Sequence, residues 1–255
     1  MRIDKLLFSR GLAKSRESAQ RMIRDGNVLV DGKIITKPSF EAAEECDITL
    51  VGETLKYVSR GGLKLERALD AFAIDVNGLD CVDIGASTGG FTDCLLKRGA
   101  SHVRAVDVGR SQLDKTLERD ERVTSFEGVN ARYLKPEDIG GLCDMAVCDV
   151  SFISLTLIMP AVSELLSEKG CFVALIKPQC EAGRANIGKN GIVKDRNIHA
   201  EVIERVIDAA AECGLHCFAL TASPILGGDG NREYLAAFDR TGGLDRTLIK
   251  KVAFE

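Results

Sequence analysis

From Asp80 onward, short apolar segments alternate with helical ones, and this alternation restricts the possible folds more than any other feature of the sequence. We predict strands near residues 81–85, 102–108, 123–127, 145–149, 171–176, 216–222 and 233–238, and helices near 90–98, 111–119, 154–168 and 197–213. Such alternation is typical of βαβ units, in which helices cover both faces of a parallel sheet. We therefore predict an α/β fold with about seven, mostly parallel strands.

The N-terminal part of the chain differs from the rest in charge. Residues 1–37 hold nine Lys or Arg against four acids, residues 38–55 hold five acids and no base, and the whole chain has a net charge of −4. A basic segment on an acidic chain indicates a module that contacts a polyanion.

This basic segment also has a recognisable local pattern. Ile3, Leu6 and Leu7 have helical spacing in "RIDKLLFSRGL", and "KSRESAQRMIRDG" predicts a second helix with its arginines largely off the apolar face. "NVLVDGKIIT" predicts a hairpin turning at Asp31-Gly32, and "CDITLVG" predicts one more strand. Over residues 1–55 this pattern resembles the αL-type RNA-binding domain of a small-subunit ribosomal protein, an α+β fold. The alternative is a small helix-hairpin fold with a solvated charged face.

The resulting domain prediction has three parts. Residues 1–56 form the RNA-binding domain, residues 57–62, within "GETLKYVSRGG", form a linker, and residues 63–255 form the α/β domain, which opens with a helix.

Several classes of protein are disfavoured. No run approaches the roughly 20 apolar residues of a membrane-spanning helix, and the N-terminus lacks the apolar stretch of a signal peptide, so we expect a cytoplasmic protein. The nine cysteines contain no CxxC pair. Cys213, His216 and Cys217 lack the spacing of a metal site, and we expect reduced thiols and no metal.

"CVDIGASTGGFTDCLL" predicts a strand, a glycine-rich turn and a helix, the arrangement that brings a ligand close to the backbone. Ser87 replaces the second glycine of a dinucleotide motif. Asp83, at the end of the strand, would repel a pyrophosphate but attract the cationic sulfonium and ammonium of S-adenosylmethionine (SAM). Asp107 ends the next strand, where an acid suits a ribose diol. The alternative is a structural turn in a protein with another ligand.

The predicted SAM site has eleven residues. They are Asp83, Gly85, Ser87, Thr88, Gly89, Gly90, Phe91, Asp107, Val108, Asn130 and Asp149. Among them, Asn130 is expected beside the adenine.

Charged residues also mark the ends of later strands. Ligands of open α/β sheets lie beyond the carboxyl ends of the strands. Asp149 ends "MAVCDV" and Lys177 ends "CFVALIK", where Pro178 stops the strand, while Lys64 lies in a helix and Glu233 begins an apolar strand. Each charge alone has an ordinary structural explanation, such as a helix cap or a lysine reaching solvent. Their order along the chain favours a catalytic set.

At this point the chain resembles a known family over nearly its whole length. The motifs are "SRGGLKL", "DIGASTGGFTDCLL", "CDVSFISL", "LIKPQCEAGR" and "GNREYL". They resemble the TlyA-like ribosomal RNA 2′-O-methyltransferases, also labelled haemolysins, which join an αL domain to an FtsJ-like methyltransferase domain. The resemblance implies a Rossmann-like SAM-dependent methyltransferase sheet, ribosomal RNA and ribosomal subunits as partners, and cytidine as the target. We also expect a monomer. It also implies a catalytic tetrad of Lys64, Asp149, Lys177 and Glu233.

The tetrad suggests a mechanism. A ribose 2′-hydroxyl must lose its proton to become a good nucleophile, so the enzyme aligns the reactants and removes that proton. We expect Lys177 to be the base, with Lys64 lowering its pKa and the two carboxylates holding the lysines in register. The carboxylates oppose that lowering, and activation by positioning alone is the alternative.

A basic loop, "PQCEAGRANIGKNGIVKDRN", follows Lys177 and is expected to grip RNA phosphates, the alternative being a mobile surface loop. With the basic N-terminal segment it provides the predicted RNA-binding set. The set is Arg2, Lys5, Arg10, Lys14, Arg16, Arg21, Arg24, Arg60, Arg184 and Lys189.

Three other functions compete with this interpretation. A non-enzymatic RNA-binding or ribosome assembly factor would not need the intact tetrad. A membrane-acting haemolysin would need an apolar span or a cationic amphipathic helix, and we expect no membrane partner. A base methyltransferase more often carries a double proline where this chain has "DVSF".

Overall fold

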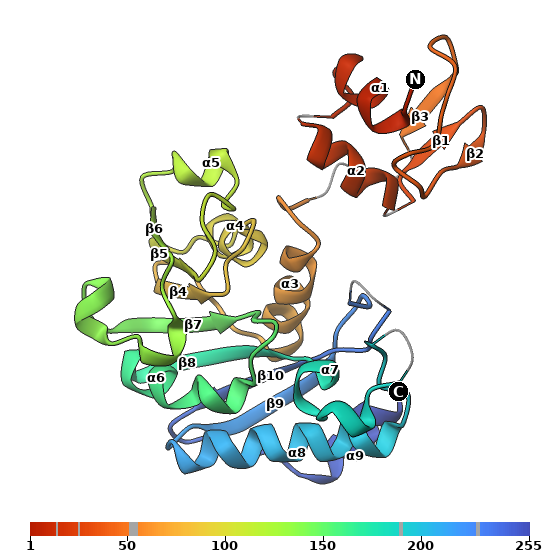
Figure 1. The fold of residues 1–255 in the computed structure, drawn as a ribbon. Coiled ribbons are helices and arrows are strands. Elements are labelled where there is room, and N and C mark those ends of the chain that lie inside the picture. The colour runs from red at the N-terminus through yellow and green to blue at the C-terminus, as the bar shows by residue number, and fades with distance from the viewer. Residues whose placement is uncertain (14, 25, 51–55, 189–190, 228–229) are drawn as a thin grey trace. The chain divides into compact units, whose positions relative to one another are not determined.

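The computed structural model describes residues 1–13, 15–24, 26–50, 56–188, 191–227 and 230–255 (Figure 1). It divides the chain into two compact units, Met1–Leu55 and Lys56–Glu255. Among the described residues, none of the helices has both the length and the hydrophobicity needed to cross a membrane.

The N-terminal unit packs two short helices with a three-stranded antiparallel sheet. Its elements are α1 (Ile3–Ser9), α2 (Arg16–Arg24), β1 (Val28–Val30), β2 (Lys33–Ile34) and β3 (Ile48–Leu50), with strand order β2-β1-β3. Ile3, Leu7 and Ile23 are fully buried in its core. The predicted hairpin is confirmed: Asp31 and Gly32 have φ angles of 48° and 76°, the pair of positive values that a two-residue turn favours.

The larger unit contains a seven-stranded sheet in the order β6-β5-β4-β7-β8-β10-β9. The strands are β4 (Asp80–Ile84), β5 (His102–Asp107), β6 (Val123–Glu127), β7 (Cys143–Cys148), β8 (Leu166–Ile176), β9 (His216–Ala222) and β10 (Tyr234–Asp239). All neighbouring pairs are parallel except those of β10, which is antiparallel to both β8 and β9. The predicted fold class, an α/β sheet of about seven mostly parallel strands beside a small α+β domain, is confirmed.

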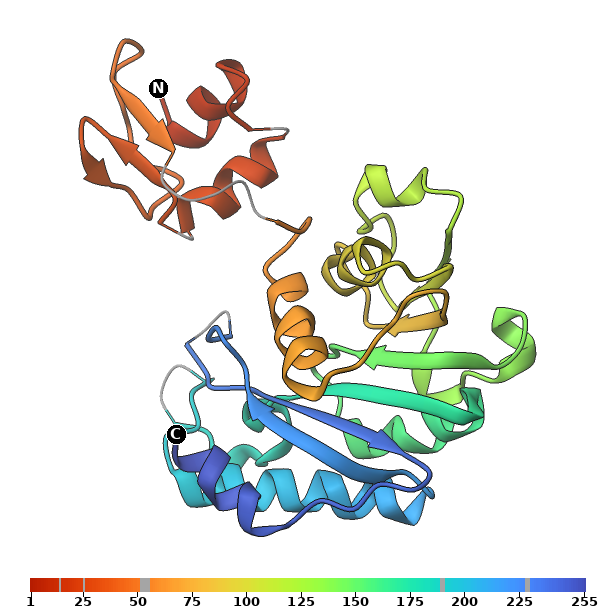
Figure 2. The same cartoon turned by 180° about the vertical axis from the view of Figure 1, so that it is seen from behind.

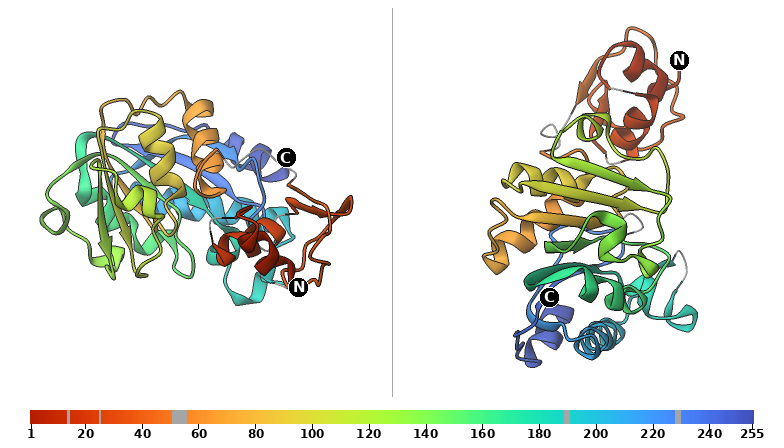
Figure 3. Two further views of the ribbon diagram at one scale, coloured as in Figure 1. Left: turned by 90° about the horizontal axis from the view of Figure 1, so that it is seen from above. Right: turned by 90° about the vertical axis from the view of Figure 1, so that its left-hand side faces the viewer.

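Helices cover both faces of this sheet (Figures 2 and 3). On one face lie α3 (Gly61–Phe72), α4 (Gly90–Lys97) and the short α5 (Lys115–Glu118), and on the other lie α6 (Met159–Leu165), α8 (Arg196–Glu212) and α9 (Thr247–Phe254). The short elements are α7 (Pro178–Glu181) and the 3-10 helices at Ala131–Tyr133, Pro136–Ile139, Leu155–Leu157 and Arg184–Asn186. Successive residues of β4 supply the two cores, since Val82 packs with one and Cys81 with the other.

Four local features of the structure differ from the predictions. The helix expected over 111–119 is only α5, and the one expected over 154–168 ends at Leu165 because Leu166 begins β8 and pairs with Cys143 of β7. Helix α9 was not predicted. Residues 57–62, expected to be a linker, pack onto the larger unit instead: Tyr57 is buried in its core and α3 begins at Gly61.

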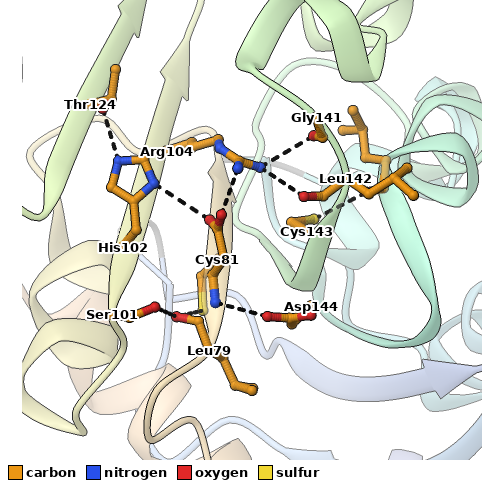
Figure 4. A network of polar contacts seen from close by, with 12 residues as sticks. Leu79, Cys81, Ser101, His102, Arg104, Thr124, Gly141, Leu142, Cys143 and Asp144 are labelled. Carbon is orange, nitrogen blue, oxygen red and sulfur yellow. Dashed lines mark hydrogen bonds and ion pairs between the residues drawn. The ribbon is translucent and has the colours of Figure 1, made fainter.

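The amino-terminal edge of the sheet is held by a buried arginine (Figure 4). Arg104 is 6% exposed, and its Nη2 donates to Asp80 Oδ2 at 2.6 Å, while Nη1 donates to the carbonyls of Gly141 and Leu142, both at 3.2 Å. The amide of Asp80 donates to Asp144 Oδ2 at 3.1 Å. This network joins the starts of β4 and β7 to β5. It therefore lies at the opposite edge of the sheet from the carboxyl ends of the parallel strands.

Candidate active site

The glycine-rich turn between β4 and α4 lies against the residue that follows β7. Gly85, Ser87 and Gly89 have φ angles of 82°, 48° and 91°, which lets the chain fold back sharply. A Cβ on Gly85 would lie 2.9 Å from the carbonyl oxygen of Asp149, so a larger residue would clash there. The amide of Asp149 donates to the carbonyl of Ile84 at 3.0 Å. The turn and Asp149 therefore form one continuous surface at the carboxyl edge.

Asp83 is a fully buried carboxylate with one free oxygen. Its Oδ2 accepts hydrogen bonds from the amide and hydroxyl of Thr92 at 2.9 and 2.7 Å, and its Oδ1 has no partner among the described residues. Burial raises the pKa of Asp83 to about 7, and the nearby charges of Asp149 and Asp107 add to that effect against the Thr92 hydrogen bonds. An unpartnered buried oxygen among three carboxylates favours a cationic ligand.

Asp107 lies at the end of the neighbouring strand and contacts the same turn. Its Oδ2 accepts from the amide of Ser87 at 2.8 Å, and its Oδ1 accepts from the amide of Gly109 at 2.6 Å. Val108, directly after it, is 74% exposed. Asn130 follows β6, and its side chain caps the next 3-10 helix by accepting from the amide of Arg132 at 3.1 Å.

The remaining predicted SAM-site residues lie in the turn or at the start of α4. Gly90 packs tightly, because a Cβ there would lie 2.2 Å from Ser59 Oγ. Phe91 is buried in the hydrophobic core, so its side chain packs inside the protein. The eleven residues thus share the carboxyl edge, but Gly90 and Phe91 also pack against the rest of the unit.

The four tetrad residues form two ion pairs at this edge. Lys177 Nζ lies 2.6 Å from Asp149 Oδ1, and Lys64 Nζ donates to Glu233 Oε2 at 2.6 Å. Asp149 and Lys177 directly follow the parallel strands β7 and β8. Glu233 joins them because β10 is antiparallel, and its first residue pairs with the last residue of β8, Ile176.

The electrostatics of Lys177 differ from our expectation. Lys177 is 8% exposed, and burial by itself lowers its pKa. The carboxylates of Asp149 and, more weakly, Glu233 outweigh burial, so the pKa is raised above its ordinary value. The expected lowering of the Lys177 pKa was therefore wrong, because the two carboxylates that oppose it prevail.

Sequence reasoning missed three side chains that support the tetrad. Ser151 Oγ accepts from Lys177 Nζ at 2.7 Å, and Gln179 Nε2 donates to Glu233 Oε1 at 3.2 Å. Glu181 is buried, and joins α7 to the segment after Asp149 by accepting from Ser154 Oγ at 2.6 Å and from the amide of residue 155 at 2.7 Å. Their positions, two to four residues from a tetrad residue, were the available signal, although nothing local indicates their partners.

The predicted RNA-binding residues lie in both units. Arg2, Lys5, Arg10, Arg16 and Arg24 belong to the N-terminal unit, and Arg60 and Arg184 to the larger one. Lys14 and Lys189, and the side chain of Arg21, lie outside the described residues. Arg10 is engaged in structure, since its guanidinium donates to the carbonyls of Cys46, at 3.0 Å, and Glu44.

In the described part of the chain, no group of three or more His, Cys, Asp or Glu side chains has an arrangement that could hold a metal ion. Cys213 caps the end of α8 and Cys217 is buried in β9.

Comparison with known families assigns each unit separately. The FtsJ-like methyltransferase family matches residues 57–240, and the S4 domain matches residues 1–47.

Similar proteins cover almost the whole chain. YqxC of Bacillus subtilis is 48% identical over 235 residues, which is 92% of this chain and 84% of YqxC. The 16S/23S rRNA (cytidine-2′-O)-methyltransferase TlyA of Mycobacterium tuberculosis is 45% identical over 234 residues, 91% of this chain and 87% of TlyA.

Solved structures agree with these matches. A protein from Streptococcus thermophilus that carries the hemolysin name has a TM-score of 0.81 and 46% identity, and the match covers 100% of this chain and 94% of that one. A SAM-dependent methyltransferase from Mesorhizobium loti, 18% identical with a TM-score of 0.50, covers 68% of this chain and 95% of its own, and shares the fold.

Proposed function

Because this chain belongs to the FtsJ-like methyltransferase family, we propose that it transfers the methyl group of SAM to a ribose 2′-hydroxyl of ribosomal RNA. The reaction class is supported by the name of the TlyA relative, and the RNA partner by the S4 domain as well. The observation that carries the proposal is the pair of lysine–carboxylate contacts beside the glycine-rich turn, with the free oxygen of Asp83 on the same edge.

The residues of the carboxyl edge fit SAM. When bound, SAM supplies an activated methyl group on a positively charged sulfur. Asp83 would neutralise the cationic methionine end, and the backbone of the turn would lie along it. Asp107 would accept the ribose hydroxyls, and the exposed side chain of Val108 would contact the adenine.

Lys177 would accept the proton of the 2′-hydroxyl. In the free protein its raised pKa keeps it protonated at neutral pH, so it must lose that proton before it can act as a base. Asp149 and Ser151 hold the Lys177 ammonium at a fixed place, and Glu233 does the same for Lys64. Positioning of the hydroxyl is therefore part of the role of both lysines.

The test is mass mapping of unmethylated 16S and 23S ribosomal RNA after incubation with the protein and SAM. We expect new methyl groups on the sugar of cytidines in one or both RNAs. Lys177→Ala should abolish them while retaining SAM binding, and Lys169→Ala, which changes an exposed lysine of the same strand, should methylate normally. Methyl groups on a base, or none with either RNA, would contradict the proposal.

Two further properties belong to the proposal. We expect the protein to act as a monomer in the cytoplasm, where ribosomal RNA is assembled into subunits. A sedimentation experiment showing a stable dimer at micromolar concentration would overturn the first of these.

A further inference from the structure

One buried carboxylate in the N-terminal unit holds several cationic side chains. Asp4, in the first turn of α1, is fully buried. Its Oδ1 accepts from Arg2 Nε at 3.0 Å, and its Oδ2 accepts from Arg2 Nη2 at 3.1 Å and Arg16 Nη2 at 3.2 Å. The two guanidinium groups lie at the surface, with side chains 42% and 49% exposed.

Asp4 also reaches a stripe of polar residues on α2. Arg16, Gln20 and Arg24 follow one another at four-residue intervals, so they share one face of that helix. Gln20 Nε2 donates to Asp4 Oδ2 at 2.8 Å, and Gln20 Oε1 accepts from Arg24 Nη2 at 3.4 Å. One carboxylate therefore connects Arg2, which precedes α1, with Arg16 and Arg24 of α2.

The electrostatic consequence is unusual for a surface that meets RNA. A carboxylate among arginines reduces the positive charge available to phosphates, so it would weaken RNA binding if charge alone mattered. Burial raises the pKa of Asp4, but hydrogen bonds from Arg2, Gln20 and Arg16 hold it far below its ordinary range, so the carboxylate is ionised at neutral pH. Arg2 and Arg16, which donate directly to Asp4, retain further N–H donors, because a guanidinium has five.

We propose that Asp4 is a positioning residue that fixes Arg2, Arg16 and, through Gln20, Arg24 in one arrangement for RNA phosphates. The inference rests on the proposed RNA-binding function. A free arginine must be immobilised when it binds a phosphate, and fixing it in advance removes that loss of side-chain freedom. The gain in preorganisation exceeds the loss of one unit of positive charge.

Positioning and simple electrostatics predict opposite results for Asp4→Asn. The variant removes a negative charge, so an electrostatic effect would tighten RNA binding. Positioning instead predicts that the dissociation constant of the full-length protein for 16S or 23S transcripts rises about tenfold, from about 0.7 kcal/mol of lost preorganisation for each of two arginines. The KM for RNA should rise, while kcat and the affinity for SAM stay unchanged.

Glu17→Gln is the matched control, because it removes an exposed carboxylate from α2 without touching the Asp4 contacts. It should leave RNA affinity unchanged or tighten it. In an Arg2→Ala/Arg16→Ala/Arg24→Ala background, Asp4→Asn should cause no further loss of RNA affinity. Equal or tighter binding by Asp4→Asn, or a full tenfold loss that persists without the arginines, would overturn the proposal.

A second variant covers the case in which Asp4→Asn unfolds the N-terminal unit, as seen by circular dichroism. Gln20→Met removes one hydrogen bond to Asp4 and no charge, and should weaken RNA binding about threefold. Unchanged affinity would refute the positioning role. If the wild-type protein binds RNA but transfers no methyl group to it, the proposed enzymatic function fails and the role of Asp4 stands.

Discussion

Replacing Asp83 with Asn should stabilise the free protein and weaken its binding of SAM. The carboxyl group is fully buried, its Oδ1 has no partner among the described residues, and its pKa is about 7 instead of the ordinary 3.8. That difference corresponds to about 4 kcal/mol of destabilisation when the group is ionised in the folded protein. Asn has nearly the same shape and carries no charge.

The pH dependence of the Asp83 ionisation shows in which direction Asp83→Asn should change the free energy of unfolding. Below about pH 4 the carboxyl is protonated in both the folded and unfolded states, so it has no effect on stability. Between pH 4 and 7 the unfolded chain ionises first and the folded state loses stability, and above pH 7 the loss is complete. The free energy of unfolding of Asp83→Asn should therefore exceed that of the wild type by up to about 4 kcal/mol at pH 8 and about 2 kcal/mol at pH 5.

Binding of SAM should show the reverse preference. Because the cationic ligand needs an ionised Asp83, the wild-type affinity should fall about tenfold from pH 8 to pH 6, and that of Asp83→Asn should be weak at both. Urea unfolding and titration calorimetry measure the two effects. Asp75→Asn, an exposed carboxylate of the same unit, should change neither. A less stable Asp83→Asn at pH 8, or a wild-type affinity independent of pH, would refute the reasoning.

Three further outcomes are expected. Methyl transfer with saturating substrates should become about tenfold faster per pH unit between pH 7 and 9, because Lys177 with its raised pKa must first lose a proton; a flat single-turnover profile would show that the proton goes elsewhere. Arg104→Met should lower the free energy of unfolding by about 3 kcal/mol in urea, because it leaves Asp80 without its buried partner, and an unchanged midpoint would contradict the bracing role of this network. Glu181→Gln should reduce kcat about tenfold at unchanged SAM affinity, since one of its two short hydrogen bonds to the segment after Asp149 is lost; normal turnover would mean that this segment is held by other contacts.

Local periodicity was sufficient for most elements of the fold. Alternating apolar segments indicated all seven strands of the large sheet, and the Asp31-Gly32 pair indicated the hairpin. Helix α9 was not predicted, although Ile249, Val252 and Ala253 follow helical spacing and are buried. The early start of β8 could not be predicted, because the pairing of Leu166 with β7 is a tertiary contact.

The candidate site was only partly predictable for the same reason. Asp149 and Lys177 follow parallel strands, so their common edge follows from the fold class. Glu233 reaches that edge only because β10 runs antiparallel between β8 and β9, which its own sequence does not indicate. The ion-pair partners of the tetrad residues were even harder to predict from the sequence. The direct contact of Lys177 with Asp149 outweighs burial and reversed the predicted change in the pKa of Lys177.

The contact between Lys64 and Glu233 spans 169 positions of the chain and joins the helix that opens the larger unit to a strand made near its end. Such a distant closure forms late, after the nearer contacts have reduced the entropy of bringing its ends together. A nascent or clipped chain that ends before Glu233 would include the N-terminal unit but would lack one member of the tetrad. Methyl transfer therefore reports that the entire unit has reached its native topology, which offers a sensitive assay for correct folding of variants.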